Sequence, residues 1–431
     1  MSRPDSLNQA CERLLQTRQA QRLPSIAAAV VRAGEVVWSG AVGYADWEGG
    51  VLATPGTQYR IGSITKTFTA VAVMQLRDGG FLDLDDRLEQ HIDGIAPGSP
   101  TIRQLVAHLS GLRREAGEMF VTGATPSVED VLGAYERVLP AARAHHYSNL
   151  AFALLGEVVA RRSGTPYMEY VDTNLIAPLD LSRTTWYEQR PNAQGYLVDE
   201  WAGTAAREPH SDMGGVAAMG QLWSTVGDLC AWASFLVDGR EGVLSPESAD
   251  ELWSPQVMVN PDEWVVGWGL GLELQRRGER VFGGHGGAMP GFLAGVYINR
   301  KTRTGAAALT NSGTQGVKDL ALDLVSTTID LWPADVGVWT PEAEPPAEIR
   351  SILGRWWSEG SEFTFCWRDA KLEATVEGAA SWQLPAVFER VGEREYRGVS
   401  GRERGELLRI EDDRLVWAGY AFTRLQEPSA G

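Results

Sequence analysis

The sequence predicts an α/β (α+β) domain, with an antiparallel sheet flanked by helices and a helical subdomain, followed by a small antiparallel β-barrel-like unit. Three observations predict this. Strand-like runs lie near both ends of the first 338 residues, helical runs lie between them, and short alternating runs follow residue 348. Strands at both ends of a helical insertion are expected to form one sheet. A chain of 431 residues also exceeds what one hydrophobic core usually organises, which favours two domains.

The N-terminal segment predicts a helix and then a β-hairpin. The run from Asp5 to Arg18 carries apolar residues at helical spacing, as an amphipathic helix does. The pattern becomes strand-like over Ile26 to Val31 and again over Glu35 to Ser39. Gly34 lies between these two runs and supplies the backbone conformation that a tight turn needs.

A long helix is expected next, and helical patterns then dominate as far as Leu236. The first of these helices runs from Ser63 to Asp78 and ends at Gly79, because glycine readily terminates a helix. Two further helices are expected at Asn149 to Arg162 and at Val226 to Leu236, each followed by a glycine. Strand character then returns in four runs, at Val265 to Leu274, Val281 to Gly284, Phe292 to Asn299 and Gly305 to Thr310.

A segment rich in proline and acidic residues marks the expected domain boundary. Residues 339–348 are interpreted as a linker, because proline stiffens a chain and suits a spacer. Residues 1–338 then form the first domain and residues 349–431 the second. Short alternating runs separated by charged or glycine turns predict a small antiparallel barrel there, at Glu362 to Trp367, Lys371 to Val376, Glu406 to Ile410 and Arg414 to Trp417.

The composition of the chain argues against several classes of binding partner. A formal net charge of -17 repels a phosphate backbone, so nucleic acid is not an expected partner. The sequence has no apolar run long enough for a membrane helix and no recognisable secretory signal, so we expect a cytoplasmic protein without a membrane partner. Three scattered cysteines show no metal-ligand spacing, and no cofactor or metal site is expected.

The strongest chemical signal is a serine followed three residues later by a lysine at the start of the long helix. This spacing places Ser63 and Lys66 on one helical face, where the amine can take the proton of the hydroxyl. Taken alone, such a pair is common, and a helical lysine is usually solvated. The apolar run from Thr67 to Met74, however, predicts a helix buried almost all round. A buried lysine has a lowered pKa, as a general base requires.

Two further motifs follow along the chain. In Tyr147-Ser148-Asn149, a phenol beside an ammonium would be partly ionised and relay protons, and the amide would bond a substrate carbonyl or the lysine. The alternative is a helix N-cap after a buried tyrosine. In Gly283-Gly284-His285-Gly286-Gly287-Ala288, glycines would let a ligand lie against a strand edge, although His285 alone would suit a polar edge position.

The ordered motifs Ser-x-x-Lys, Tyr-x-Asn and His-Gly-Gly resemble those of the serine β-lactamase and penicillin-binding-protein superfamily. The resemblance is strongest to the branch that contains class C β-lactamases, D-aminopeptidases and esterases. It covers roughly residues 8–330 and includes the segments Tyr59 to Gly62, Thr101 to Leu112 and Gly267 to Gly271. The C-terminal unit is similar to the lipocalin-like barrels appended to some members, with residues 354–357 as its entry strand.

The resemblance implies a mechanism and a set of site residues. Ser63 would attack an acyl carbonyl and form an acyl-enzyme, while Lys66 and Tyr147 move protons. The substrate-binding residues would be Asn149, His285, Gly286, Gly287 and Ala288, and the backbone N-H groups of Ser63 and Ala288 would form the oxyanion hole. His108, His145 and His146 are interpreted as structural or surface residues.

One departure from the family pattern affects the expected substrate. His285 stands where many members have lysine, and a histidine is cationic only near or below neutral pH, which disfavours β-lactam carboxylates. We therefore expect a hydrolase of amide or ester bonds in small-molecule or short-peptide substrates, including D-amino acid amides. The alternatives are an acyl transferase or peptide cyclase, a weak β-lactamase, and a catalytically silent ligand-binding protein. Homo-oligomerisation is left open.

Overall fold

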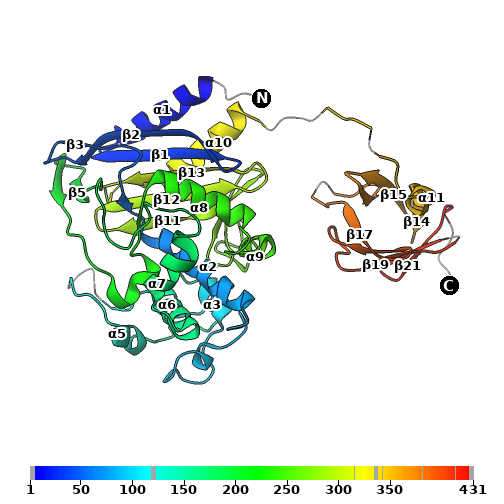
Figure 1. The fold of residues 1–431 in the computed structure, drawn as a ribbon, viewed down its shortest axis with the longest axis horizontal. Helices are drawn as coiled ribbons and strands as arrows, with labels where there is room; N and C mark the ends of the chain where they lie inside the picture. Colours follow the sequence, from blue (N-terminus) through cyan, green and yellow to red (C-terminus); the bar gives the residue numbers. More distant parts are fainter. Residues whose placement is uncertain are drawn as a thin grey trace. The chain divides into compact units, whose positions relative to one another are not determined.

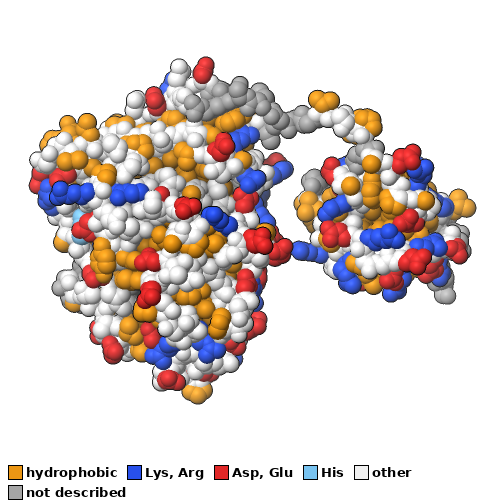
Figure 2. Space-filling view, in the orientation of Figure 1, with side chains coloured by type: hydrophobic (Ala, Val, Ile, Leu, Met, Phe, Trp, Pro, Cys, Tyr) orange, Lys and Arg blue, Asp and Glu red, His pale blue; other side chains and the backbone are white. Residues whose placement is uncertain are grey.

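The computed structural model describes residues 5–117, 123–314, 316–333, 338–341, 343–380, 382–412 and 414–426. These residues divide into two compact units, residues 1–335 and 336–431, and each unit has its own fold (Figure 1). Glu342, which belongs to the predicted linker, lies outside the described residues. Acidic and basic side chains are interspersed over the visible faces of both units (Figure 2).

The first unit is built on a nine-stranded sheet in which all neighbouring strands are antiparallel. Its centre joins the two ends of the domain, because Ile26 pairs with Thr310 and Arg32 pairs with Thr304. The prediction of one sheet assembled from both ends is therefore confirmed. In spatial order the strands are β3 (Val51–Leu52), β2 (Glu35–Asp46), β1 (Ser25–Arg32), β13 (Thr304–Thr310), β12 (Phe292–Asn299), β11 (Arg280–Met289), β10 (Glu273–Arg277), β9 (Val266–Trp268) and β8 (Val257–Met258).

Two strand predictions differ from the structure. The run Val265 to Leu274 is not one strand, because the chain turns between β9 and β10 at Gly271, whose φ is +77°. That conformation is costly for residues with a side chain, so the glycine permits the turn. The run Val281 to Gly284 is only the first part of β11, which continues through the glycine-rich motif to Met289.

Helices cover both faces of this sheet (Figure 1). Alternate residues of β1 belong to two separate cores, one on each face of the sheet. In the first core, Ile26 and Ala28 pack with helices α1 (Asp5–Gln19) and α10 (Lys318–Leu331). Ala27 and Ala29 belong to the second core. The second core contains α2 (Thr65–Asp78), α6 (Asn149–Ser163) and α8 (Val226–Asp238). This period of two is what strand geometry requires of a sheet buried on both faces.

The predicted helical insertion contains short strands as well as helices. Two small antiparallel pairs lie within or beside it, β4 (Tyr59–Arg60) with β7 (Trp223–Ser224) and β5 (Tyr196–Asp199) with β6 (Thr204–Arg207). The remaining helical elements are η1 (Gly62–Ile64), η2 (Leu88–Gln90), α3 (Ile102–Val106), α5 (Val128–Gly133), α7 (Tyr167–Val171), η3 (Asp172–Ile176), η4 (Gly214–Met219) and α9 (Pro246–Leu252).

The second unit is an eight-stranded antiparallel barrel preceded by the short helix α11 (Ala347–Ile352). Reciprocal backbone hydrogen bonds between Trp357 and Thr423 join the first and last strands. The strands are β14 (Gly354–Ser358), β15 (Ser361–Arg368), β16 (Lys371–Val376), β17 (Ala386–Gly392), β18 (Glu395–Gly398), β19 (Leu407–Ile410), β20 (Leu415–Trp417) and β21 (Tyr420–Phe422). No helix among the described residues of the chain is long and apolar enough to cross a membrane.

Candidate active site

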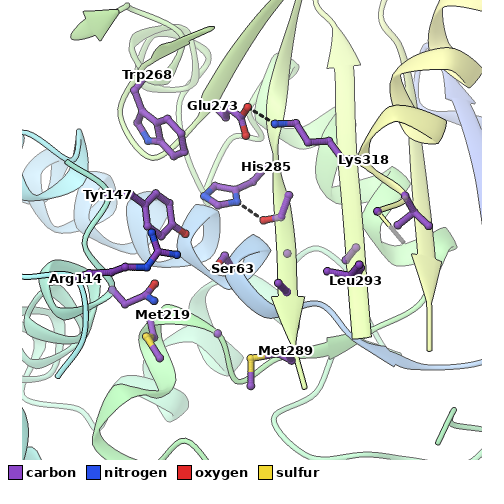
Figure 3. Close-up of a pocket in the computed structure, with 18 of the residues that line it drawn as sticks. Ser63, Arg114, Tyr147, Met219, Trp268, Glu273, His285, Met289, Leu293 and Lys318 are labelled. Atoms are coloured by element: carbon purple, nitrogen blue, oxygen red, sulfur yellow. Dashed lines mark hydrogen bonds and ion pairs between the residues drawn. The ribbon is translucent and has the colours of Figure 1, made fainter. Parts of the chain in front are cut away.

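A cavity of about 720 Å³ lies in the first unit beside η1 and β11 (Figure 3). Its volume is within the usual range for small-molecule sites. Seven of the eight site residues predicted from the sequence line it, and the eighth, Lys66, contacts the lining residue Ser63. The seven are Ser63, Tyr147, Asn149, His285, Gly286, Gly287 and Ala288.

Two glycines allow the backbone around Ser63 to approach β11. Gly62 has a φ of +51°, and a Cβ added there would come within 2.7 Å of the backbone N and O of Ala288. A Cβ added at Gly287 would lie 1.9 Å from the carbonyl oxygen of Ile61. Any side chain at either position would therefore push the two segments apart. This close approach puts the backbone of η1 beside that of Ala288, as the expected oxyanion hole requires.

Lys66 lies in the first turn of α2 and is fully buried. Its Nζ donates hydrogen bonds to Ser63 Oγ at 2.9 Å and to the carbonyl oxygen of Met219 at 2.7 Å. Burial lowers the pKa of Lys66 well below its usual range, although Glu115 opposes this effect. The environment thus favours the neutral amine, which can act as a base toward the Ser63 hydroxyl in contact with it.

Tyr147 is held within a group of aromatic rings. Its ring centroid lies 4.2 Å from that of His108 and 5.7 Å from that of Trp268, and Lys66 Nζ lies 5.1 Å from its ring. Its hydroxyl shares a hydrogen bond with Ser63. Burial raises the pKa of Tyr147, and the bond with Ser63 only partly opposes this. Burial therefore opposes the partial phenolate expected from the sequence and favours the neutral phenol.

The Tyr-x-Asn motif combines a structural role with a place in the cavity. Ser148 caps α6 by accepting a hydrogen bond from the backbone N-H of Ala151, as the structural interpretation of the motif predicted. Asn149 is the first residue of that helix and donates from Nδ2 to Glu115 Oε1 at 2.7 Å. Its buried Oδ1 has no partner among the described residues, which leaves an acceptor at the cavity.

His285 lies on β11 and is almost fully buried. Its Nδ1 contacts the carbonyl oxygen of Gly286 (Figure 3). Burial, followed by the proximity of Lys66, lowers the pKa of His285 to about 4. At neutral pH the imidazole is therefore neutral, which agrees with the expectation that His285 supplies no permanent cation for a substrate carboxylate.

Sequence reasoning did not find an ion pair at the far side of the cavity. Glu273 of β10 accepts a hydrogen bond from Lys318, the first residue of α10 (Figure 3). It also accepts from Gln275 at 2.6 Å and from Tyr297 at 3.1 Å. Burial acts to raise the pKa of Glu273, but Lys318 and Gln275 lower it overall. The Lys318 side chain passes beside Gly286, with Cδ 3.7 Å from a Cβ built there.

A second ion pair and one histidine were also missed as cavity residues. Arg114 and Glu115 form an ion pair at 3.3 Å, and both line the cavity near Tyr147. They lie just beyond the segment Thr101 to Leu112, which resembles the family, but their own residue types carry no signal. His145 lines the cavity and packs on Trp268 at 5.0 Å, so its assignment as a structural or surface residue is incomplete. His108 is structural, because its Nδ1 accepts from the backbone of Ser148 at 3.1 Å.

The family follows from a direct comparison with known proteins. Residues 11–326 match the profile of the family described as Beta-lactamase. This chain belongs to the beta-lactamase family. Residues 345–424 match a second profile, described as a domain of unknown function, DUF7586. Members of the beta-lactamase family include serine hydrolases with this α/β fold, which agrees with the sheet and the serine-lysine pair described above.

This beta-lactamase family member is similar to several known proteins. Beta-lactamase-like protein 2 of Dictyostelium discoideum is 32% identical over 267 residues, which are 57% of this chain and 48% of that protein. The chain therefore spans about half the length of this relative. A D-stereospecific amidohydrolase from Streptomyces sp. has 26% identity and a TM-score of 0.63, covering 75% of this chain and 98% of that one. An octameric penicillin-binding protein homologue from Pyrococcus abyssi has 24% identity and a TM-score of 0.69, covering 96% and 99%.

Proposed function

We propose that this protein is a serine hydrolase that cleaves an amide or ester bond of a small amino-acid derivative through an acyl-enzyme on Ser63. The observation that carries the proposal is the distance of 2.9 Å between Ser63 Oγ and the buried amine of Lys66, at the wall of a cavity of about 720 Å³. A nucleophile in contact with a base of lowered pKa is what acyl transfer requires.

The proposed reaction has three proton transfers in each half. Ser63 Oγ attacks the carbonyl carbon while the neutral amine of Lys66 takes the hydroxyl proton. Tyr147 then gives its phenolic proton to the leaving amine or alcohol, and the ammonium of Lys66 returns a proton to the tyrosine. Water then attacks the carbonyl carbon of the acyl-enzyme with Lys66 again as the base. The bond to Ser63 Oγ breaks, Tyr147 gives its proton to that oxygen, and Lys66 returns a proton to the tyrosine, so that the acid is released. The oxyanion would accept hydrogen bonds from the backbone N-H groups of Ser63 and Ala288.

The charges of the cavity favour a substrate derived from an amino acid. Arg114 and Glu115 lie on one side, and Glu273 and Lys318 on the other. A ligand that carries an ammonium or a carboxylate beside its scissile carbonyl would meet a complementary charge on either side. A preference for D-configured acyl groups is supported by the D-stereospecific amidohydrolase of Streptomyces sp., which shares 26% identity with this chain.

The proposal is tested by mass spectrometry of the intact protein. The chain would be incubated separately with amides and p-nitrophenyl esters of D- and L-phenylalanine, and with a penicillin. We expect a mass increase equal to the acyl group, formed faster from the D-derivatives, and absent in Ser63→Ala. Added hydroxylamine should shorten the adduct's lifetime and give the hydroxamate. If no probe gave an adduct or was consumed, the chain would be a ligand-binding member of its family.

The pH dependence of acylation should be set by Lys66 and not by His285. Because burial lowers the pKa of His285 to about 4, this residue is neutral throughout the range from about pH 6 to 9. The acid limb of kcat/KM should therefore report protonation of Lys66, and the rate should rise with pH as the amine loses its proton. We expect His285→Gln to keep the shape of this profile while changing KM. A shift of the acid limb by more than about one unit in His285→Gln would contradict this assignment.

The ion pair between Glu273 and Lys318 should contribute to stability in a pH-dependent way. Replacing Lys318 by methionine leaves a buried carboxylate without its cation, which should lower stability by about 1–3 kcal/mol at neutral pH, the usual cost of a buried group that loses its hydrogen-bond partner. The folded pKa of Glu273 is lowered, so this contribution is present above the ordinary carboxyl pKa and disappears as acid protonates the group.

Thermal unfolding of Lys318→Met checks this expectation. Its Tm should lie several degrees below that of the unaltered chain near neutral pH, and the gap should narrow as the pH falls to about 4. The exposed Lys301 provides a matched control, and Lys301→Met should change Tm little at either pH. A gap that stays constant with pH would show that Lys318 acts through packing alone.

A further inference from the structure

The barrel of the second unit has a cavity of about 370 Å³ at one end. The other end is closed by α11, whose Ile349 and Ile352 belong to the barrel core. Trp356 fixes the helix there by donating from Nε1 to the carbonyl oxygen of Ile352 at 2.7 Å. β14 runs from that closed end to Ser358, which lines the cavity. The cavity is therefore the open mouth of the barrel.

Aromatic rings form the floor of this mouth. Phe363, Trp417 and Phe422 line the cavity, and the ring centroid of Phe422 lies 4.9 Å from Phe363 and 5.9 Å from Trp417. Trp417 and Phe422 also belong to the barrel core, so the floor is the upper layer of that core. Above it the lining residues are small, and they leave the space unfilled. These are Ser358, Ser361, Gly378, Ala379, Ala380 and Ala418.

The rim of the mouth is acidic. Three carboxylates line the cavity, those of Glu359, Glu377 and Glu403, against one guanidinium, that of Arg402. The Arg402 charge is already paired with Glu403 at 3.4 Å. Tyr420 lines the same cavity and is 50% exposed, which presents a ring at the entrance. An apolar floor below an acidic and aromatic rim is complementary to a cation with an apolar body.

We propose that the mouth of this barrel is a second ligand site, which binds a small organic ammonium carrying one aryl or branched alkyl group. The apolar group packs on Phe363, Trp417 and Phe422, and the ammonium lies at the level of Glu377 and Glu403. A volume of about 370 Å³ suits one compact ligand and excludes a folded peptide segment. All of the lining residues of this site belong to the second unit, whereas Ser63 belongs to the first.

Photoaffinity labelling of the full-length chain tests the location of this site. Ser63→Ala would be used so that the probe is not turned over. The probe is a primary ammonium that carries a benzophenone, and a benzophenone carboxylate of equal size is the matched control. After irradiation, peptide mapping should find the ammonium probe in the strands that line the mouth, and excess 2-phenylethylammonium should prevent this labelling. Labelling confined to residues 5–333, or equal labelling by the carboxylate, would overturn the proposal.

Substitutions that remove charges from the rim, and one that fills the cavity, complete the test. Calorimetric titration with 2-phenylethylammonium should show about a five-fold weaker affinity in Glu377→Gln/Glu403→Gln, the size expected for exposed charge pairs. Glu406→Gln removes the same charge from an exposed position outside the cavity and should leave the affinity unchanged. Ser361→Phe fills the mouth and should remove barrel labelling, with Tm measured to show that the unit remains folded. An equal effect of Glu406→Gln, or unchanged labelling of folded Ser361→Phe, would contradict the proposed site.

Discussion

Replacing Ser63 by alanine is expected to remove acyl-enzyme formation and to lower kcat/KM by about 10³- to 10⁶-fold. The hydroxyl is the proposed nucleophile, and it lies 2.9 Å from the amine that would take its proton. Without it, Lys66 has no group to activate, so the remaining rate reflects substrate binding and polarisation alone. Rates would be measured with the ester that acylates the unaltered chain fastest, and the adduct would be located by peptide mapping.

Two further variants separate loss of the nucleophile from loss of structure. Ser39 is an exposed serine of β2, so Ser39→Ala should keep full activity. Ser63→Cys restores a nucleophile at the same position and should again form a covalent adduct with activated esters. A Ser63→Ala protein that still carried an acyl group would contradict the assignment, and the mapped peptide would then name another nucleophile.

The sequence was sufficient for the parts of the site that lie close together along the chain. A spacing of three residues on a buried helix predicted the contact between Ser63 and Lys66, and the structure has Ser63 Oγ and Lys66 Nζ within hydrogen-bond distance. The strands near residues 26 and 305 were expected in one sheet, and they are paired neighbours at its centre. Both predictions rest on local patterns, in which spacing fixes which side chains share a face.

Charged groups from distant elements could not be found in this way. Glu273 and Lys318 are separated by 45 positions, and they meet only because β10 pairs with β11 and α10 packs on the same sheet. Neither residue stands in a motif, so only the strand register brings them to the cavity. Arg114 and Glu115 are likewise placed by a loop, where no periodicity restricts the direction of a side chain.

Protonation states were only partly predictable from the sequence. A phenol beside an ammonium can exist partly as phenolate, which favoured partial ionisation of Tyr147, and His285 was expected to be cationic only near or below neutral pH. In the structure both groups and Lys66 are buried together, so burial disfavours the charged form of each. The sequence indicated that one helix is buried. It did not indicate that the three motifs are buried against one another, and this shared burial shifts the pKa values of Lys66, Tyr147 and His285.

Replacing Lys66 by methionine is expected to lower the rate of acylation of Ser63 by about 10²- to 10⁴-fold, the usual contribution of a general base. Methionine has a similar length but no basic nitrogen, so the shape of the helix face is kept while the proton acceptor is lost. The rate would be measured from the burst of product released by an activated ester. Lys66→Arg should be as inactive, because a guanidinium stays protonated and cannot serve as a base.

Stability distinguishes this catalytic role from a structural one. Lys66 is fully buried and its pKa is lowered well below its usual range by that burial, so folding must deprive the amine of its proton or of its hydration. Methionine carries no such penalty, and we expect the Tm of Lys66→Met to equal or exceed that of the unaltered chain. A lysine kept for stability would give the opposite result, with a lower Tm and little loss in the acylation rate of the folded fraction. Loss of activity without loss of stability is thus the outcome that assigns the buried amine to the reaction.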